Sequence, residues 1–358
     1  MKILCVIDSL RSGGAQRQLV NLAIAFQKKG HQVEFLVYHS DSFYYEILLE
    51  KKIKLIEVLE SNYIKRIFKM RKVIRTGNYN AVLSFLEAAS FISTLAGFPY
   101  RKWNLIIGER SANPNIFKLF KLKMYRWFHL FATAIVSNSH ENLKIVKKIN
   151  PLLSENKLHV IYNLIDFDNW QPRSDNYIYG KNGKFNLTVV ASHQYLKNLN
   201  GLVEAVNLLE THEKNTLIIN WYGDVLDSSK FEAIEKIKKY HLEDIFNFHD
   251  ATKEISSKVN AADAVGLFSF YEGLPNAICE AMVNAKPIIS SNVSDVNLFL
   301  SNDYIFSPDQ STDIAKKIKF LLSLDQSALI QAGQINRNLA STIFSEDEIV
   351  KQYLSIMS

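Results

Sequence analysis

Short apolar runs alternate with amphipathic stretches along almost the whole chain. The runs Lys2–Ile7 and Gln32–Tyr38 predict strands, and the stretch between them, from about residue 15 to residue 29, has apolar residues at helical spacing. The alternation continues to an apolar run at Leu158–Tyr162 and begins again at Asn186–Ala191. Because strands that alternate with helices form parallel sheets, we predict two doubly wound, Rossmann-like α/β domains.

The stretch from 166 to 183 is rich in Asp, Asn, Gly and Tyr, and it separates the two series. At 358 residues the chain is also too long for one ordinary core. We therefore predict a first domain at residues 1–165, a second at 166–341, and a C-terminal helix at 342–358 that packs back on the first domain. The first apolar run is too short for a signal peptide, and no stretch is long and uncharged enough to span a bilayer.

Charge is divided unevenly between the two halves. The formal net charge is +6, but residues 1–150 hold 24 Lys and Arg against 10 Asp and Glu, and residues 151–358 hold 18 against 26. This excess indicates that the first half meets an anionic partner, which could be nucleic acid, phospholipid or a phosphorylated substrate. Nucleic acid is disfavoured as a partner, because no nucleic-acid-binding motif occurs.

Two stretches of the first half, Lys65–Arg75 and Ile116–Phe131, concentrate this basic charge. In a single helix over 116–131, seven apolar side chains would fall within an arc of roughly 120°, with basic side chains on the other side. One interpretation is an ordinary helix with its apolar face on the sheet and a solvated basic face. The other is a surface for an anionic membrane or a lipid-linked diphosphate. The candidate membrane-facing or acceptor-facing residues are Lys118, Lys121, Lys123 and Arg126.

The stretch Phe270–Lys286 carries two carboxylates, Glu272 and Glu280, separated by seven residues. A buried strand is predicted before it and a helix after it, with Pro275 at the helix start. The turn would place Glu272 beside backbone N–H groups at a helix N-terminus, which is a ready anion site. The alternative is a plain helix start with two solvated glutamates.

Lys197 lies in a predicted strand-to-helix loop of the same domain. Since ligands bind at the carboxyl ends of parallel strands, Lys197 could place its charge on a phosphate near Glu272, although exposed loop lysines are common. The glycines Gly13 and Gly14 also open a helix, where they either let a ligand approach or simply form a tight turn. No metal-ligand cluster and no Ser-His-Asp signature occurs, so we expect neither a metal nor another cofactor.

Taken in order, these motifs resemble the retaining GT-B glycosyltransferases of the family 4 type. The resemblance covers nearly the whole chain, and the matching segments are Gly13–Gln16, Ser139, Val160–Asn163, Lys197-Asn198, Gly223-Asp224 and the E-x7-E element from Glu272 to Glu280. It implies two Rossmann-like domains that face each other across a cleft. It also implies a metal-independent enzyme that takes a nucleotide-sugar as donor.

The resemblance further implies roles for single residues. Glu272 would bind hydroxyls of the donor sugar, Glu280 would hold the ribose, and Lys197 would neutralise the diphosphate. The implied donor-binding residues are Gly13, Gly14, Ser192, Lys197, Gly223, Asp224, Glu272, Gly273, Leu274, Pro275 and Glu280, and the implied catalytic residues are Glu272, Lys197 and Arg110.

The sequence departs from the family pattern at three places. Ser192 stands where many members have an arginine that contacts the phosphates, and Arg110 stands where many have a histidine. Arg110 could supply the missing cation but not a general base. The segment Val293–Asp295 replaces a family glycine.

We therefore expect a cytoplasmic glycosyltransferase, peripheral at the inner face of the membrane. It would move a hexose or N-acetylhexosamine from a UDP-sugar to a glycan acceptor linked to polyprenyl diphosphate, in surface polysaccharide synthesis. Two alternatives stay open. One is a soluble transferase with a small-molecule acceptor, and the other is a non-catalytic protein that binds a sugar nucleotide.

Overall fold

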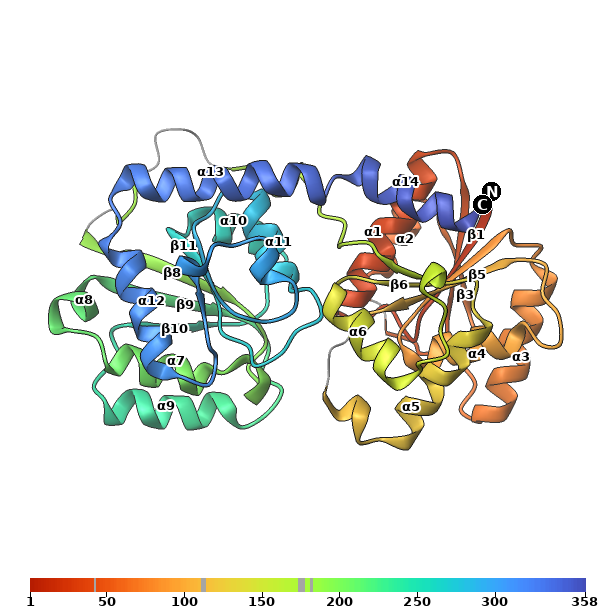
Figure 1. The fold of residues 1–358 in the computed structure, drawn as a ribbon, viewed down its shortest axis with the longest axis horizontal. Coiled ribbons are helices and arrows are strands. Elements are labelled where there is room, and N and C mark those ends of the chain that lie inside the picture. The colour runs from red at the N-terminus through yellow and green to blue at the C-terminus, as the bar shows by residue number, and fades with distance from the viewer. Residues whose placement is uncertain (42, 111–113, 173–177, 181–182) are drawn as a thin grey trace. The chain divides into compact units, whose positions relative to one another are not determined.

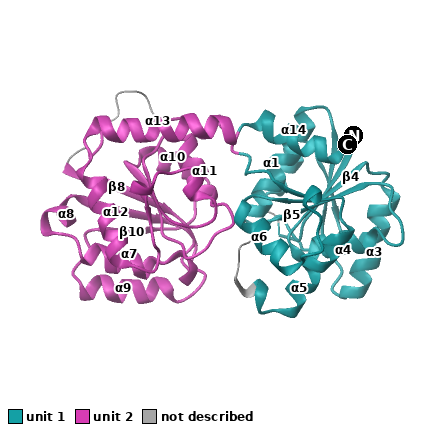
Figure 2. Cartoon of the chain, viewed as in Figure 1, with its two compact units in different colours: residues 1–164, 345–358 teal, residues 165–344 magenta. Residues whose placement is uncertain are grey.

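The computed structural model describes residues 1–358 except 42, 111–113, 173–177 and 181–182 (Figure 1). The chain divides into two compact units. Unit 1 holds Met1–Leu164 and Ser345–Ser358, and unit 2 holds Ile165–Phe344 (Figure 2). The sequence places these boundaries at 165/166 and 341/342. The predicted linker at 166–183 falls partly outside the described residues.

Unit 1 is built on one parallel sheet with the strand order β3-β2-β1-β4-β5-β6-β7. Side chains alternate between its two faces, so that Ile3 and Cys5 of β1 belong to one apolar cluster and Leu4 and Val6 to another. The strands are β1 (Lys2–Val6), β2 (Gln32–Val37), β3 (Lys54–Glu57), β4 (Ala81–Phe85), β5 (Asn104–Glu109), β6 (Ala134–Ser137) and β7 (Leu158–Val160).

Helices cover both faces of this sheet (Figure 1). They are α1 (Gly14–Lys28), α2 (Tyr45–Glu50), α3 (Tyr63–Thr76), α4 (Glu87–Ala96), α5 (Phe120–Trp127), α6 (His140–Ile149) and α14 (Glu346–Met357). The last helix returns to unit 1 and packs on α1, with the rings of Phe26 and Tyr353 6.1 Å apart. An ion pair between Lys28 and Glu346 supports the same contact.

Unit 2 has a parallel sheet of order β10-β9-β8-β11-β12-β13. Its strands are β8 (Phe185–Val190), β9 (Leu217–Tyr222), β10 (Phe246–His249), β11 (Ala264–Leu267), β12 (Ile288–Ser291) and β13 (Ile305–Phe306). Its helices are α7 (Leu199–Asn207), α8 (Thr211–Thr216), α9 (Ser229–Lys239), α10 (Ile255–Ala261), α11 (Asn276–Val283), α12 (Ser311–Ser323) and α13 (Gln326–Ile343). The predicted doubly wound α/β class is therefore confirmed.

The strand order reverses once in each sheet. In unit 1, β2 and β3 lie on one side of β1 and β4 lies on the other, while in unit 2 the reversal falls between β8 and β11. The loops that follow the two strands at such a reversal run in opposite directions and leave a crevice at the carboxyl edge. Each unit therefore offers one such position for a ligand.

The prediction of one continuous helix over 116–131 is wrong. The segment is a 3-10 turn at Pro114–Phe117, then α5, then a second 3-10 turn at Phe128–Phe131. Phe120 is 81% exposed, and Trp127 and Phe131 are also exposed. Among the predicted surface residues, Lys118 and Lys121 are exposed and Lys123 is half-buried.

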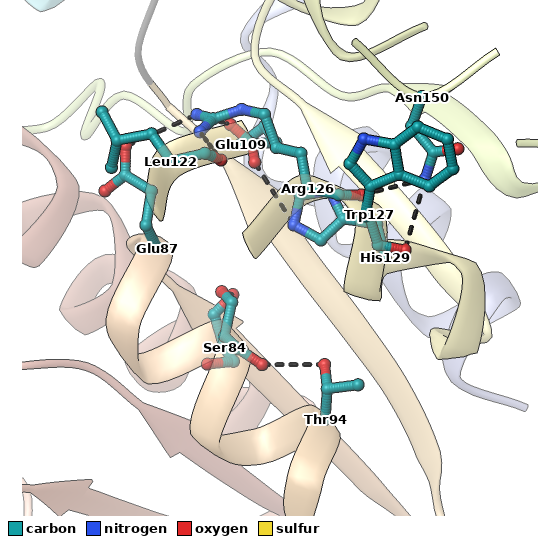
Figure 3. Close-up of polar contacts among 10 residues, drawn as sticks. Ser84, Glu87, Thr94, Glu109, Leu122, Arg126, Trp127, His129 and Asn150 are labelled. Carbon is teal, nitrogen blue, oxygen red and sulfur yellow. Dashed lines mark hydrogen bonds and ion pairs between the residues drawn. The ribbon is translucent and has the colours of Figure 1, made fainter. Parts of the chain in front are cut away.

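Arg126, predicted to face the membrane, is instead fully buried. Figure 3 shows its polar contacts. Its Nη2 donates to Glu109 Oε2 at 2.8 Å and to Glu87 Oε1 at 3.4 Å, and its Nη1 donates to the Leu122 carbonyl at 3.2 Å. The reason is that Glu109 ends a central strand with its carboxylate inside the fold. A buried carboxylate requires a nearby cation, so the arginine turns inward, while Phe120, Trp127 and Phe131 stay exposed.

His129 lies against the same carboxylate, with its Nε2 3.4 Å from Glu109 Oε1. Burial, together with the charge of Arg126, lowers the pKa of His129 to about 3. The ring is therefore neutral at physiological pH, and Arg126 alone supplies the positive charge. Asn150, also buried, fixes this turn by donating to the carbonyls of Arg126 and Trp127 at 3.0 and 3.3 Å.

We expect Arg126→Met to destabilise unit 1 selectively. The change leaves the Glu109 carboxylate buried without its cation, which typically costs about 3 kcal/mol or more. Amide hydrogen exchange in β5 and β6 should then be about 100-fold faster, while exchange in β8 and β9 of unit 2 stays unchanged.

Lys121→Met is the matched control, because it removes an exposed cation from the same helix. It should leave both units unaffected. Equal exchange rates in the two variants would mean that the Arg126 ion pair does not stabilise the unit.

Candidate functional site

The functional site predicted for the second domain lies at the strand-order reversal of unit 2. Lys197 follows β8 and Glu272 follows β11, the two strands that flank the reversal. Lys197 Nζ donates to Glu272 Oε1 at 2.5 Å, and the hydroxyl of Ser269 donates to the same oxygen at 2.7 Å. Both ionic side chains are about 15% exposed, so the pair is largely shielded yet open to solvent.

The loop that carries Lys197 is rigid for identifiable reasons. Tyr195–Lys197 forms a 3-10 turn, and Asn198 follows in the left-handed conformation with φ +56°. The Asn198 side chain accepts from the Gly201 amide at 3.1 Å, which caps α7, and donates to the Pro308 carbonyl at 2.8 Å. Asparagine is the non-glycine residue best suited to this backbone region.

The loop that carries Glu272 is tied to the Lys197 loop by main-chain and ring contacts. The Phe270 amide donates to the Leu196 carbonyl at 2.9 Å, and the rings of Tyr195 and Phe270 lie 5.2 Å apart. Pro275 then serves as the N-cap residue of α11. Helix α11 begins at Asn276, four residues after Glu272, and a helix start is a typical place for an anion.

Glu280 lies within α11 and is buried. Together with Gly273, Leu274 and Pro275 it belongs to the same strand–turn–helix element as Glu272. The structure thus brings the two carboxylates of the E-x7-E motif into one element, with Glu272 at its mouth. The predicted contact of Glu280 with a ribose stays a prediction.

Ser192, Gly223 and Asp224 line the ends of the neighbouring strands β8 and β9. The His193 amide donates to the Asp224 carbonyl at 2.7 Å, which joins the two loops. A Cβ on Gly223 would lie 2.1 Å from the Ala191 carbonyl oxygen, so only glycine fits this approach. The Ser192 hydroxyl accepts from the Gln194 side chain at 2.8 Å.

His193 stiffens this edge without offering a charge. Its ring is fully buried and stacks on Trp221 with centroids 5.6 Å apart. Burial, reinforced by the charge of Lys230, lowers the pKa of His193 to about 4. The ring is therefore neutral at physiological pH, and Lys197 is the cation that the Ser192–Lys197 loop presents.

The segment Val293–Asp295, which replaces a family glycine, contains one residue with a positive φ. Ser294 has φ +53°, in the left-handed region that glycine adopts most readily. The loop therefore keeps the glycine-type conformation although the residue differs.

The remaining predicted residues lie in unit 1. Gly13 is the N-cap residue of α1 and Gly14 its first residue, at the carboxyl edge of the sheet beside β1. Arg110 follows β5, where its guanidinium lies 4.2 Å from the centroid of the Phe85 ring. It donates to Asn163 Oδ1 at 3.1 Å and to the Tyr353 hydroxyl at 2.5 Å, so it links the end of β5 to α14. Its predicted contact with a phosphate stays a prediction.

The described residues contain no group of three or more His, Cys, Asp or Glu side chains arranged to hold a metal ion. Cys5 and Cys279 are both buried free thiols.

Sequence reasoning missed Ser269 as a site residue and named Asn198 only as part of a matching segment. Ser269 lies just after β11 and is followed by Phe270, so a lone polar residue near the end of an apolar run is the available signal. Asn198 follows Lys197 directly and precedes a helical stretch, which is a typical cap position. Both act by holding the charged pair in place.

Known protein families match both units. The family described as "Glycosyltransferase Family 4" matches residues 12–169, and the family described as "Glycosyl transferases group 1" matches residues 176–336. Together they span nearly all of unit 1 and unit 2.

Two characterised relatives match over most of the chain. A Campylobacter jejuni protein named GalNAc-alpha-(1->4)-GalNAc-alpha-(1->3)-diNAcBac-PP-undecaprenol alpha-1,4-N-acetyl-D-galactosaminyltransferase is 24% identical over 90% of this chain and 89% of its own. The amylovoran biosynthesis glycosyltransferase AmsD of Erwinia amylovora is 24% identical over 100% of this chain and 99% of its own.

Solved structures share the fold. Anabaena HepE, crystallised with UDP and glucose, superposes with a TM-score of 0.86 at 18% identity and covers 99% of this chain and 98% of its own. The lipopolysaccharide outer core galactosyltransferase WaaB gives a TM-score of 0.72 at 12% identity, with 99% of each chain covered. The two family matches, the relatives and the fold agree, and the chain belongs to the family 4 type of GT-B glycosyltransferases.

Proposed function

We propose that this glycosyltransferase moves a hexose or N-acetylhexosamine from a UDP-sugar to a glycan acceptor, with retention of the α configuration and without a metal. The observation that carries the proposal is the Lys197–Glu272 pair at the strand-order reversal of unit 2. Lys197 binds the donor diphosphate, Glu272 accepts hydrogen bonds from hydroxyls of the donor sugar, and Glu280 holds the ribose.

Charge builds up on the diphosphate as the bond to the sugar breaks. In this proposal Lys197 and the helix start of α11 stabilise that charge, which is the task that a metal ion performs in other transferases. Glu272 shares its oxygen with Ser269 and Lys197, so its carboxylate is held in a fixed direction for the sugar hydroxyls. Attack from the face that the nucleotide leaves retains the configuration, as the family resemblance implies, and requires no covalent enzyme intermediate.

The choice of UDP is supported by HepE, whose structures contain UDP, UDP with glucose, and UDP-glucose. The choice of a lipid-linked acceptor is supported by the Campylobacter jejuni relative, whose name includes an undecaprenyl diphosphate-linked glycan. A role in surface polysaccharide synthesis is supported by the amylovoran relative.

A membrane-facing surface of unit 1 fits such an acceptor. Helices α3 and α5 are joined by a hydrogen bond between the hydroxyls of Tyr63, at the start of α3, and Tyr125 of α5, which lie 3.5 Å apart. Exposed apolar side chains lie on these helices or next to them, and these are Ile64, Phe68, Leu119, Phe120, Trp127 and Phe131. Aromatic side chains among lysines are typical of surfaces that bind the interface of an anionic membrane. No helix within the described residues is long and apolar enough to cross a bilayer, and we propose peripheral binding at the inner face.

We expect Glu272→Ala to lower the rate of sugar transfer by roughly 10- to 100-fold while the fold survives. The change removes a charged hydrogen-bond acceptor from the donor sugar, and such a contact is worth roughly a 10- to 100-fold change even when the rest of the site persists. Nucleotide release from a panel of UDP- and GDP-sugars, with and without EDTA, measures the effect. The wild type should release UDP from at least one donor at the same rate in EDTA.

Glu235→Ala is the matched control, because Glu235 forms an exposed pair with Lys238 on α9 of the same unit. It should leave nucleotide release unchanged. Wild-type rates in Glu272→Ala would refute the site, and donor binding without release or transfer would favour a non-catalytic sugar-nucleotide-binding protein.

We expect the triple variant Lys118→Gln, Lys121→Gln and Lys123→Gln to bind anionic vesicles about 100-fold more weakly. Each basic residue near an anionic surface contributes about 1 kcal/mol, so three contribute about 3 kcal/mol. Flotation with phosphatidylglycerol-containing vesicles, compared with pure phosphatidylcholine, measures the loss. Arg126 is left intact because it is buried.

The control replaces Lys316, Lys317 and Lys319 on α12 of unit 2 in the same way. It should bind vesicles like the wild type. If the wild type does not float with anionic vesicles at all, a soluble transferase with a small-molecule acceptor replaces the membrane proposal.

A further inference from the structure

Unit 1 has its own strand-order reversal, between β1 and β4, and Glu87 lies directly beside it. Glu87 is the first residue of α4 and follows β4 after a single intervening residue, Leu86. The backbone of Leu86 has φ +70° and ψ 150°, a region that residues with a Cβ rarely adopt. Such backbone strain persists where the surrounding structure enforces it, and it fixes where Glu87 starts the helix.

A buried ion pair holds the Glu87 carboxylate at this position. Arg126 Nη2 lies 2.8 Å from Glu109 and 3.4 Å from Glu87, so its stronger bond goes to Glu109. Glu109 and Arg126 are buried, whereas the Glu87 side chain is 28% exposed. The Glu87 carboxylate is therefore held on its inner side by Arg126 (Figure 3), while its other oxygen lone pairs stay open to solvent.

The cluster carries a net negative charge at its open end. Two carboxylates face one guanidinium, and His129 adds no charge because burial lowers its pKa to about 3. This is an exception within a half of the chain that holds 24 basic and 10 acidic residues. A phosphate or a uronic acid at this point would be repelled, whereas a hydroxyl would find a charged acceptor.

The position of Glu87 in unit 1 matches that of Glu272 in unit 2. Glu87 follows β4 and Glu272 follows β11, and each of these strands lies on the same side of the reversal in its sheet. Arg126 pairs with Glu87, and Lys197 pairs with Glu272. Both carboxylates are partly exposed at the carboxyl edge of their sheets. The two sheets thus present the same kind of group at the same topological place.

We propose that Glu87 accepts hydrogen bonds from hydroxyl groups of the acceptor's terminal sugar, and that this sugar is uncharged. The proposal rests on the proposed transferase function and adds the acceptor class to it. Glu87 is the group that touches the acceptor. Arg126 and Glu109 are positioning residues that aim its carboxylate.

The test is equilibrium binding of two glycosides that differ only at C6, octyl α-D-galactoside and octyl α-D-galacturonide, measured by ligand-observed NMR with UDP present. The wild type should bind the galactoside at least about 10-fold more tightly than the galacturonide. Glu87→Gln should weaken galactoside binding about 10- to 100-fold, since it removes a charged acceptor, and should lose the preference for the uncharged glycoside. UDP affinity should not change.

Glu57→Gln is the matched control, because Glu57 is an exposed carboxylate that ends β3 in the same sheet. It should bind both glycosides like the wild type, and thermal melting should show that both variants are folded. The proposal is overturned if Glu87→Gln binds the galactoside like the wild type, if the wild type binds the galacturonide equally well, or if it binds neither glycoside while UDP binds. Failure of UDP binding itself would instead overturn the proposed function.

Discussion

The ion pair between Lys197 and Glu272 is the interaction on which the functional architecture depends. It joins the loops after β8 and β11, the two strands between which the sheet of unit 2 reverses its order. The pair is largely shielded from water, yet each group retains an open side. A lysine without a partner would be a solvated, mobile cation, so the carboxylate keeps Lys197 in place for the diphosphate that we propose it binds.

Around this pair, much of the surrounding structure serves to hold two loops still. Asn198 takes a left-handed backbone and caps α7, Gly223 allows two strand ends to approach, and neutral His193 packs against Trp221. Unit 1 repeats the plan with different residues. There the strained Leu86 and the buried Arg126 fix Glu87 beside the reversal between β1 and β4. Both carboxylates present oxygen atoms suited to sugar hydroxyls, which fits an enzyme that brings two sugars together.

Much of this could be predicted from the sequence, because strand and helix periods are local and the site motifs lie in short segments. The alternation of apolar runs predicted the doubly wound class. The positions of Lys197 and Glu272 after such runs predicted that their loops form the site. Arg126 could not be placed correctly, since its burial depends on Glu109, a residue 17 positions away that ends a central strand with its carboxylate inside. Glu87 was not predicted as a site residue, because the local sequence pattern indicates neither the positive φ of Leu86 nor the strand order.

The most direct test of the division of labour between Lys197 and Glu272 is calorimetric binding of UDP alone to the wild type, Lys197→Met and Glu272→Gln. UDP carries the diphosphate but no sugar, so Glu272 contributes repulsion and competes for Lys197, while Lys197 contributes attraction. Glu272→Gln should therefore bind UDP at least as tightly as the wild type, whereas Lys197→Met should bind it about 10- to 100-fold more weakly. If Glu272→Gln lost as much UDP affinity as Lys197→Met, the two residues would not divide sugar from diphosphate, and the assignment of the site would be wrong.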